Sequence, residues 1–358
     1  MRKISLIFLC ALLATACNTQ LNQSSESKKP KNIILMIGDG MGTAQVYSAF
    51  IKNKGHLNLQ RCTHTGFAFT NSASNLITDS GAGGTAIACG VKTTNYFIGM
   101  SSDSSRLQSI LEIAEDHNKA TALVASSAVT HATPASFIAH TPSRYNYEDI
   151  ASDYLKTDID IFIGGGLKYF NQRSDSTDLI SQLEAKDYQI AYNMDQLLNS
   201  KSNKIAGLIY ENHPPKFSEG RGDFLSKASL KAIEVLNKKK NGFFMMIEGS
   251  QIDWAAHDKD NEYLINETVD FDNTVGDILD FAELDGETLV IILADHETGG
   301  YGITGGDLNT GEVKGEFIFD NHTAVMVPIF AFGPGAENFS GMMQNTAVFE
   351  KMHQLFGF

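Results

Sequence analysis

KNIILMIGDGMG, residues 31–42, is the stretch that says most about the fold. Its apolar part, Lys31–Ile37, is short and is followed by a glycine-rich turn, so it predicts a strand buried on both faces. Apolar or β-branched runs of the same kind recur at Ala122–Ala125, Ile159–Gly164, Phe243–Ile247, Leu289–Ala294 and Val327–Phe332. The chain therefore contains several candidate strands for one sheet.

Helical patterns separate these predicted strands. They lie at Leu107–His117, Leu225–Lys238 and Ile265–Phe281. Alternating strands and helices are typical of proteins in which helices cover both faces of a mostly parallel sheet. We therefore predict an α/β fold, a three-layer sandwich with a central, mostly parallel β-sheet flanked by helices. No repeat or proline-rich linker divides residues 31–358, which we expect to form a single domain.

The composition excludes several classes of protein. Hydrophobic residues make up 42% of the chain and charged residues 20%, which is incompatible with a disordered chain, a collagen or a coiled coil. The formal net charge is −14, and the longest run of basic residues has only three members, Lys238–Lys240. Because binding to nucleic acid requires clustered Lys and Arg, we expect no nucleic-acid partner.

The N-terminus has the pattern of an export signal. Met1–Lys3 is basic, Ile4–Leu13 is apolar, and small residues lead to Cys17. We predict a signal peptide at residues 1–16 and a flexible tether at residues 17–30, rich in Ser, Asn, Gln and Lys. Small residues before a Cys favour a bacterial lipoprotein, lipidated at Cys17 and held at the membrane in the periplasm. The alternative is an ordinary cleaved signal with an incidental Cys.

The remaining cysteines are too few for more than one disulfide in the expected domain. Cys10 lies in the predicted signal, so Cys62 and Cys89 are the two thiols of the expected domain. An exported compartment permits a disulfide between them, but two buried thiols are equally compatible with their positions. We expect no structural disulfide.

Acidic and imidazole side chains follow three of the predicted strands. Ligands bind at the carboxyl ends of the strands in open α/β sheets, so these residues are candidates for a site. An Asp after a strand is more often a helix cap, and a single His is seldom a ligand. Together, however, they predict a polynuclear metal site: Asp39, Glu248, Asp253, His257, Asp295 and His296.

The spacing of these residues supports metal binding. Asp253 and His257 are four apart, so they share one face of a helix and can hold one ion. Asp295 and His296 are adjacent, so they can act together only beyond the end of a strand, where the chain turns. Oxygen and nitrogen ligands without thiolates suit zinc, and oxygen-rich positions suit magnesium.

The segment TDSGAGGTA, residues 78–86, contains a candidate nucleophile. Ser80 follows an Asp and precedes small residues, so it can begin a helix beside free backbone N–H groups. The alternative is an ordinary Ser in a glycine-rich turn. No Gly-x-Ser-x-Gly elbow is present here, so Ser80 would need activation by a metal ion. Its glycines predict a more mobile segment than an alanine-rich one.

Six separated motifs together resemble the alkaline phosphatase family, over roughly residues 30–335. They occur in that family's order. With only 25 residues between His296 and His322, the chain is similar to bacterial members with a compact crown. The motifs are IGDGMG with Asp39, TDSGAGGTA with Ser80, His131–Ala135, Glu248–His257, ADHETGG with Asp295 and His296, and NHTA with His322.

The resemblance implies a role for each matching residue. Ser80 resembles the nucleophile that takes the phosphoryl group, and Arg144 the arginine that holds two phosphate oxygens, oriented by Asp79. Taken alone, Arg144 would be a solvated surface charge.

His131 stands where some members have Asp, and Trp254 where some have Lys. The implied ligands are Asp253, His257 and His322 for one zinc; Asp39, Asp295, His296 and the Ser80 oxygen for a second; and Asp39, Thr133 and Glu248, beside His131, for magnesium.

The function implied by the resemblance is metal-dependent hydrolysis of phosphate monoesters through a phosphoserine intermediate, with release of inorganic phosphate at alkaline pH. Its implied cofactors are two Zn²⁺ and one Mg²⁺, its substrates small phosphate monoesters, and its assembly a homodimer. Membrane contact would be limited to the lipid at Cys17. A related sulfatase would need x-Pro-x-Arg after the nucleophile, which Ser80 lacks. A related phosphodiesterase usually has a Thr nucleophile and no Arg144-like clamp, and an inert binding protein would have lost ligands.

Overall fold

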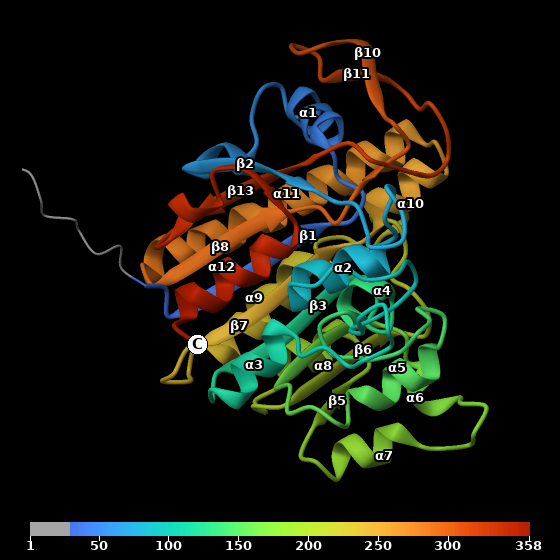
Figure 1. Ribbon diagram of the computed structural model, residues 1–358, viewed down its shortest axis with the longest axis vertical. Helices are drawn as coiled ribbons and strands as arrows, with labels where there is room; N and C mark the ends of the chain where they lie inside the picture. Colours follow the sequence, from blue (N-terminus) through green and yellow to red (C-terminus); the bar gives the residue numbers. More distant parts are fainter. Residues whose placement is uncertain (1–28) are drawn as a thin grey trace, which may run out of the picture.

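A sheet of ten strands forms the centre of the computed structural model, which describes residues 29–358 (Figure 1). The predicted signal peptide, Cys17 and most of the predicted tether lie outside the described residues. The order of the strands is β14-β2-β13-β8-β1-β7-β3-β4-β6-β5. Their bounds are β1 Asn32–Gly38, β2 His64–Phe69, β3 Ala120–Ala128, β4 Ile161–Gly165, β5 Gln189–Ala191, β6 Ile205–Tyr210, β7 Phe243–Gly249, β8 Thr288–Leu293, β13 Val327–Phe332 and β14 Gly341–Gln344.

Strand direction agrees with the predicted mostly parallel sheet. Within the described sheet only β13 runs antiparallel to its neighbours, β8 and β2. Strands β2, β5, β6 and β14 were not among the predicted ones. Each of them is very short or contains a glycine, so its apolar pattern is weak.

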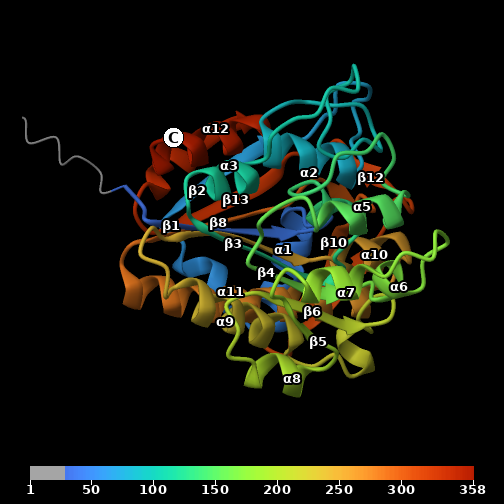
Figure 2. The same ribbon diagram turned by 90° about the horizontal axis from the view of Figure 1, so that it is seen from below.

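Helices cover both faces of the sheet, which confirms the three-layer sandwich. In Figure 2 the helices α2 (Ser80–Cys89), α3 (Ile110–Asp116) and α12 (Thr346–Phe356) lie on one side of the strands. On the other side lie α8 (Met194–Asn199), α9 (Phe224–Leu236) and α11 (Asn261–Asp285). The predicted helix Ile265–Phe281 is thus longer at both ends, because Asp260 caps its start and Gly286, with φ 65°, ends it.

Shorter elements lie around these layers. The remaining helices are α1 Thr43–Lys52, α4 Ala132–Ala135, α5 Tyr147–Asp153, α6 Lys168–Asn171, α7 Leu179–Glu184 and α10 Gln251–His257, with 3₁₀ turns at Asn58–Arg61, Phe217–Glu219 and Ala336–Phe339. Two small ribbons pair β10 (Gly302–Asp307) with β11 (Glu312–Glu316) and β9 (Glu297–Thr298) with β12 (His322–Thr323). No helix within residues 29–358 is both long and apolar enough to cross a membrane.

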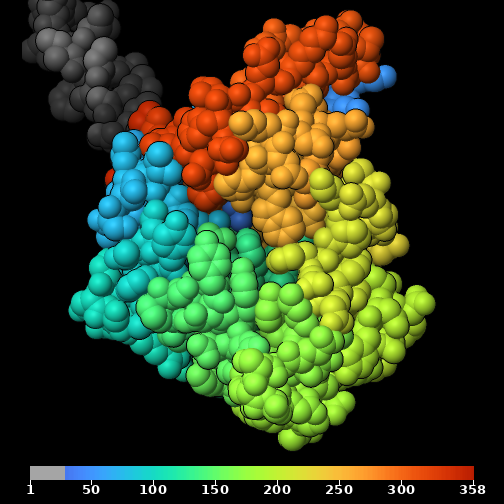
Figure 3. All heavy atoms as spheres, turned by 90° about the vertical axis from the view of Figure 1, so that its right-hand side faces the viewer, coloured from blue at the N-terminus to red at the C-terminus, as the bar shows by residue number. Residues whose placement is uncertain are grey.

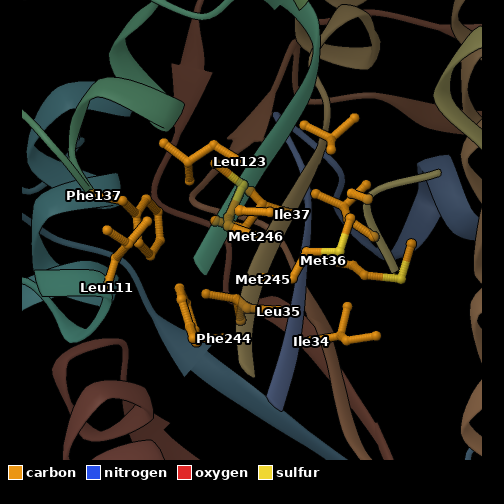
Figure 4. Close-up of a cluster of buried hydrophobic side chains, with 14 of the residues drawn as sticks. Ile34, Leu35, Met36, Ile37, Leu111, Leu123, Phe137, Phe244, Met245 and Met246 are labelled. Carbon is orange, nitrogen blue, oxygen red and sulfur yellow. The ribbon is translucent and has the colours of Figure 1, made fainter. Parts of the chain in front are cut away.

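The central strand β1 explains why residues 31–42 carry so much information. All seven of its residues are buried, because β1 lies between β7 and β8 and under helices on both faces. Figure 4 shows side chains from β1 alternating across the sheet, with Leu35 and Ile37 on the side of Phe137 and Ile34 and Met36 on the other. A continuous apolar run therefore fits this position.

The two cysteines of the described chain are free thiols. Cys62 is half-buried and Cys89 is buried in the core. Burial raises the pKa of Cys62 to about 12 and also raises the pKa of Cys89. Both are therefore protonated thiols at neutral pH.

Candidate active site

Three neighbouring strands bring acidic residues to one edge of the sheet. Asp39 follows β1, and Asp295 follows β8. Glu248, predicted to follow a strand, lies inside β7, which extends to Gly249; its Cα pairs with that of Ile37 in β1. Because β7, β1 and β8 are adjacent and parallel, their carboxyl ends lie together. In Figure 3, segments coloured cyan, green, gold and orange-red, which are far apart in sequence, meet around a hollow on the surface.

The first cluster of possible metal ligands consists of Asp253, His257 and His322. As predicted, Asp253 and His257 lie on one helix, α10, one turn apart. The Nε2 atoms of the two histidines are 3.1 Å apart, and Asp253 Oδ1 is 3.3 Å from one and 3.4 Å from the other. The cluster thus presents one carboxylate and two imidazoles to a single point.

The tautomers of these histidines follow from their other hydrogen bonds. His257 Nδ1 lies 2.7 Å from the carbonyl of Asp320, and His322 Nδ1 lies 2.9 Å from the carbonyl of Thr78. A carbonyl only accepts, so each Nδ1 carries the proton and donates it. In the neutral imidazoles, two Nε2 lone pairs then face each other, an arrangement that a cation between them satisfies.

The second cluster consists of Asp39, Asp295 and His296, all buried. His296 Nε2 is 3.3 Å from Asp295 Oδ2, 3.5 Å from Asp39 Oδ1 and 3.2 Å from Ser80 Oγ. Asp39 Oδ1 and Asp295 Oδ2 are buried and have no hydrogen-bond partner among the described residues. Asp295 and His296 lie beyond the end of β8, as their adjacency requires.

The third cluster shares Asp39 and adds His131 and Glu248. Thr133 donates from Oγ1 to Asp39 Oδ2 at 3.3 Å. Within the part of the chain described, Glu248 Oε1 and His131 Nδ1 are buried without a hydrogen-bond partner. Buried polar atoms rarely lack partners, so these converging groups fit a bound cation.

The protonation of this region reflects its crowded negative charge. Burial, followed by the charges of Asp295, Asp253 and Glu248, raises the pKa of Asp39 well above its usual value. Burial likewise raises the pKa of Glu248 to about 7 and that of Asp295 to about 6. Carboxylates this close cannot all ionise without a compensating positive charge. Bound cations would supply that charge.

Ser80 is the first residue of helix α2, as expected for a nucleophile presented at a helix start. The side chain of Asp79 caps the helix by accepting from the N–H groups of Gly81 and Ala82 at 3.2 and 3.0 Å. Ser80 therefore lies at the positive end of the helix dipole, which favours an anion beside its Oγ.

Arg144 reaches the same site. It donates from Nη1 to Asp79 Oδ2 at 3.0 Å, and its Nη2 lies 3.5 Å from His131 Nε2. Its side chain is only 12% exposed, so it is not a solvated surface charge. Ser80 and Arg144 line one pocket of about 520 Å³ together with Asp253, His257 and His322. The predicted site residues therefore lie together in space.

Two residues near the clusters were not anticipated. Thr298 donates from Oγ1 to Asp253 Oδ1 at 2.5 Å and is 3.2 Å from His296 Nδ1, so it links the first two clusters. His213 packs edge-on against the rings of His131 and Trp254, and its Nδ1 accepts from the N–H of Ala128 at 3.0 Å. Thr298 lies within the ADHETGG motif, which was the only indication of it in the sequence, and nothing in the sequence indicated His213.

Comparison with known proteins agrees with the geometry of the site. Residues 30–317 match the family model for alkaline phosphatase. The chain is 37% identical over 318 residues to alkaline phosphatase 4 of Bacillus subtilis, covering 83% of this chain and 68% of the relative. It is also 30% identical over 416 residues to the alkaline phosphatase of Escherichia coli, covering 94% and 88%.

Solved structures agree as well. Alkaline phosphatase from the Antarctic bacterium TAB5 matches with a TM-score of 0.89 and 40% identity, over 93% of this chain and 99% of that one. A variant of that protein, with one histidine replaced by Asp, was solved with Mg bound in a site termed M3 and matches with a TM-score of 0.88. The chain described here therefore belongs to the alkaline phosphatase family and is a metal-dependent phosphatase.

Proposed function

We propose that this phosphatase hydrolyses phosphate monoesters through a phosphoserine formed on Ser80. The observation that carries the proposal is the position of Ser80 Oγ, 3.2 Å from His296 Nε2, at a helix N-terminus and in one pocket with Arg144. In the proposed reaction Ser80 Oγ bonds to phosphorus as the ester P–O bond breaks and the alcohol leaves. Water then cleaves the phosphoserine, which releases inorganic phosphate and restores Ser80.

We assign two Zn²⁺ and one Mg²⁺ to the three clusters. The mixed carboxylate–imidazole sets around His257 and His296 suit zinc, and the set formed by Asp39, Thr133 and Glu248 is richer in oxygen and suits magnesium. The ions would stabilise negative charge on Ser80 Oγ and on the leaving alcohol oxygen. Mg bound in the histidine-to-aspartate variant of the TAB5 enzyme supports magnesium in this family.

The protein groups have distinct tasks in this proposal. Arg144 binds two oxygens of the phosphoryl group through its planar guanidinium, and Asp79 holds that guanidinium in place. Thr298 holds the side chains of Asp253 and His296 in position relative to each other through its hydroxyl. A hydrogen bond from His257 to Asp253 raises the pKa of His257 to about 9. Protons therefore compete with metal for this ligand, and alkaline pH favours the metal.

Export, anchoring and assembly are further parts of the proposal. We assign residues 1–16 as signal peptide, Cys17 as the lipidated residue, 17–30 as tether and 31–358 as one catalytic domain in the periplasm, acting as a homodimer. The participation of both β1 and β14 in one sheet supports a single domain. Labelling with radioactive palmitate, lost in Cys17→Ser, tests the anchor, and light scattering tests the dimer.

The activity itself is tested by comparing a monoester with a diester. p-Nitrophenyl phosphate should be hydrolysed with release of one phosphate per nitrophenol, and bis(p-nitrophenyl) phosphate much more slowly. Exhaustive chelation should abolish the reaction, and Zn²⁺ with Mg²⁺ should restore it better than either ion alone. Faster turnover of the diester would contradict the assignment.

A further inference from the structure

The mouth of the pocket that contains Ser80 and Arg144 carries two exposed tyrosines with no part in the proposed chemistry. Tyr96 is 50% exposed and Tyr145 is 62% exposed, and both line this pocket. Their ring centroids are 6.0 Å apart with planes tilted by 34°. Two neighbouring exposed aromatic rings in the same pocket as Arg144 form an apolar surface next to a site that would bind the phosphate anion.

The backbone of Tyr96 is held in an unfavourable conformation by the residues of the phosphate clamp. Its φ is 73°, in the left-handed region, which bulky residues rarely adopt. The N–H of Tyr96 donates to Asp79 Oδ1 at 2.9 Å, and its carbonyl accepts from the N–H of Arg144 at 2.8 Å. The backbone positions from which the two tyrosine side chains extend are therefore held close to the Asp79–Arg144 pair.

A second pair of backbone hydrogen bonds makes this arrangement rigid. Ile98 and Thr141 form an antiparallel bridge, with N–H to carbonyl distances of 2.9 and 3.0 Å. The bridge ties the segment of Tyr96 to the segment that continues to Arg144 and Tyr145. Because both segments are held, a ring placed against the tyrosines would meet a surface that is already formed.

We propose, on the basis of the proposed function, that Tyr96 and Tyr145 select phosphate monoesters whose alcohol carries a flat ring, such as nucleoside monophosphates. With the phosphate fixed between Ser80 and Arg144, the alcohol portion extends toward the mouth of the pocket, where its ring stacks on the tyrosines.

The test compares adenosine 5′-monophosphate with ribose 5-phosphate. Both esters release a primary alcohol of the same kind, so a difference between them reports the base and not the leaving group. We expect kcat/KM of the wild-type enzyme to be about tenfold higher for adenosine 5′-monophosphate, mostly through KM. In the Tyr96→Leu/Tyr145→Leu double variant this ratio should fall to about two or less. Tyr96→Phe/Tyr145→Phe should keep it.

Controls separate stacking from damage to the clamp. Tyr47, which is 54% exposed and stacks on Phe50, lies outside the lining of this pocket, so Tyr47→Leu should leave the ratio unchanged. Inhibition by inorganic phosphate and turnover of ribose 5-phosphate should be retained in the leucine variants. If the double variant loses both, Tyr145→Leu alone, which leaves the backbone of Tyr96 unaltered, should still lower the ratio about threefold.

Two results would overturn the inference, and they differ from failure of the proposed function. A wild-type ratio near one, with normal turnover of ribose 5-phosphate, would show that the tyrosines do not select the ring. So would a tenfold ratio that persists in the leucine variants. Absence of hydrolysis of both esters by the metal-loaded wild-type enzyme would instead contradict the proposed function, and the selectivity with it.

Discussion

At the level of single residues, the site depends on which ring nitrogen of each histidine is free. His257 and His322 donate from Nδ1 to backbone carbonyls, and His296 Nδ1 lies against the hydroxyl of Thr298. In each case Nε2 is left to face the carboxylates. The orientation of the ligands is therefore set by atoms outside the clusters, and a cation adds a partner to an arrangement that already exists.

His131 differs from these three because it lies in the oxygen-rich cluster, where an imidazole brings no negative charge to a bound cation. Its Nδ1 is buried and, within residues 29–358, has no hydrogen-bond partner; burial lowers the pKa of His131, which keeps the ring neutral. His131→Asp should therefore tighten Mg²⁺ and lower the concentration for half-maximal activation by about tenfold or more. Titration of both forms with Mg²⁺ measures this. Superimposable curves would show that His131 does not tune the site.

At the level of elements, helix α2 shows how packing overrides local propensity. Its glycines are poor helix formers, yet residues 80–89 form a helix and all ten are buried; the mobility expected of this segment stays a prediction. A Cβ added to Gly84 would lie 2.8 Å from Ser136 Oγ and 3.1 Å from Ser136 Cβ. Gly84 thus allows α2 to approach α4 closely, which gives a packing reason for a residue that sequence alone associated with mobility.

Gly84→Ala tests this packing directly. In an ordinary helix the change would stabilise by up to about 1 kcal/mol, but crowding of a packed interior costs about 1–3 kcal/mol. We expect the free energy of unfolding of the metal-loaded protein to fall by about 1 kcal/mol in a urea titration. Adding Ser136→Ala should recover part of the loss by removing the hydroxyl. Stabilisation by Gly84→Ala alone would refute the argument.

The helices and strands around the site also show which parts of it could be predicted from the sequence. The shared helix face of Asp253 and His257, and the position of Asp295 beyond a strand, follow from helical period and from strand ends, which are local properties. Thr298 contacts a residue 45 positions away and His213 one 85 positions away, so their roles depend on how distant segments meet. Nothing in the sequence near Tyr96 indicates its left-handed backbone.

At the level of the whole molecule, an acidic chain binds an anionic substrate because the site gathers positive charge locally. The formal net charge is −14, and the clusters themselves contain four carboxylates, Asp39, Glu248, Asp253 and Asp295. Arg144 alone does not balance them. Three divalent ions would reverse the sign of the site while the rest of the surface stays acidic. Metal loading, stability and substrate binding are therefore linked.

Metal should add more stability as the pH rises. Without metal, a hydrogen bond to Asp253 raises the pKa of His257 from its usual 6.5 to about 9. The proton on His257 therefore stabilises the fold, and this contribution is present in full below about pH 6.5. That contribution is lost as the pH rises through 9. With metal in place of the proton, no such loss occurs. The metal-dependent part of the free energy of unfolding should grow by about 1–2 kcal/mol between pH 7 and 9.5, allowing for the partly exposed ring.

Urea titrations of the chelated and metal-loaded protein at both pH values measure this difference. Groups outside the site titrate equally in the two forms, so they cancel in the comparison. A metal-dependent stabilisation that is constant or smaller at pH 9.5 would contradict the competition between protons and metal.

The most direct measurement of the central claim is to trap the phosphoryl group on the protein. Metal-loaded enzyme is mixed with a ³²P-labelled phosphate monoester at mildly acidic pH, quenched with acid and digested, and the labelled peptide is sequenced. We predict that the label lies on Ser80 and is absent in Ser80→Ala, whose monoesterase activity should fall by orders of magnitude with the fold intact. Label on another residue, or label that persists in Ser80→Ala, would contradict the account.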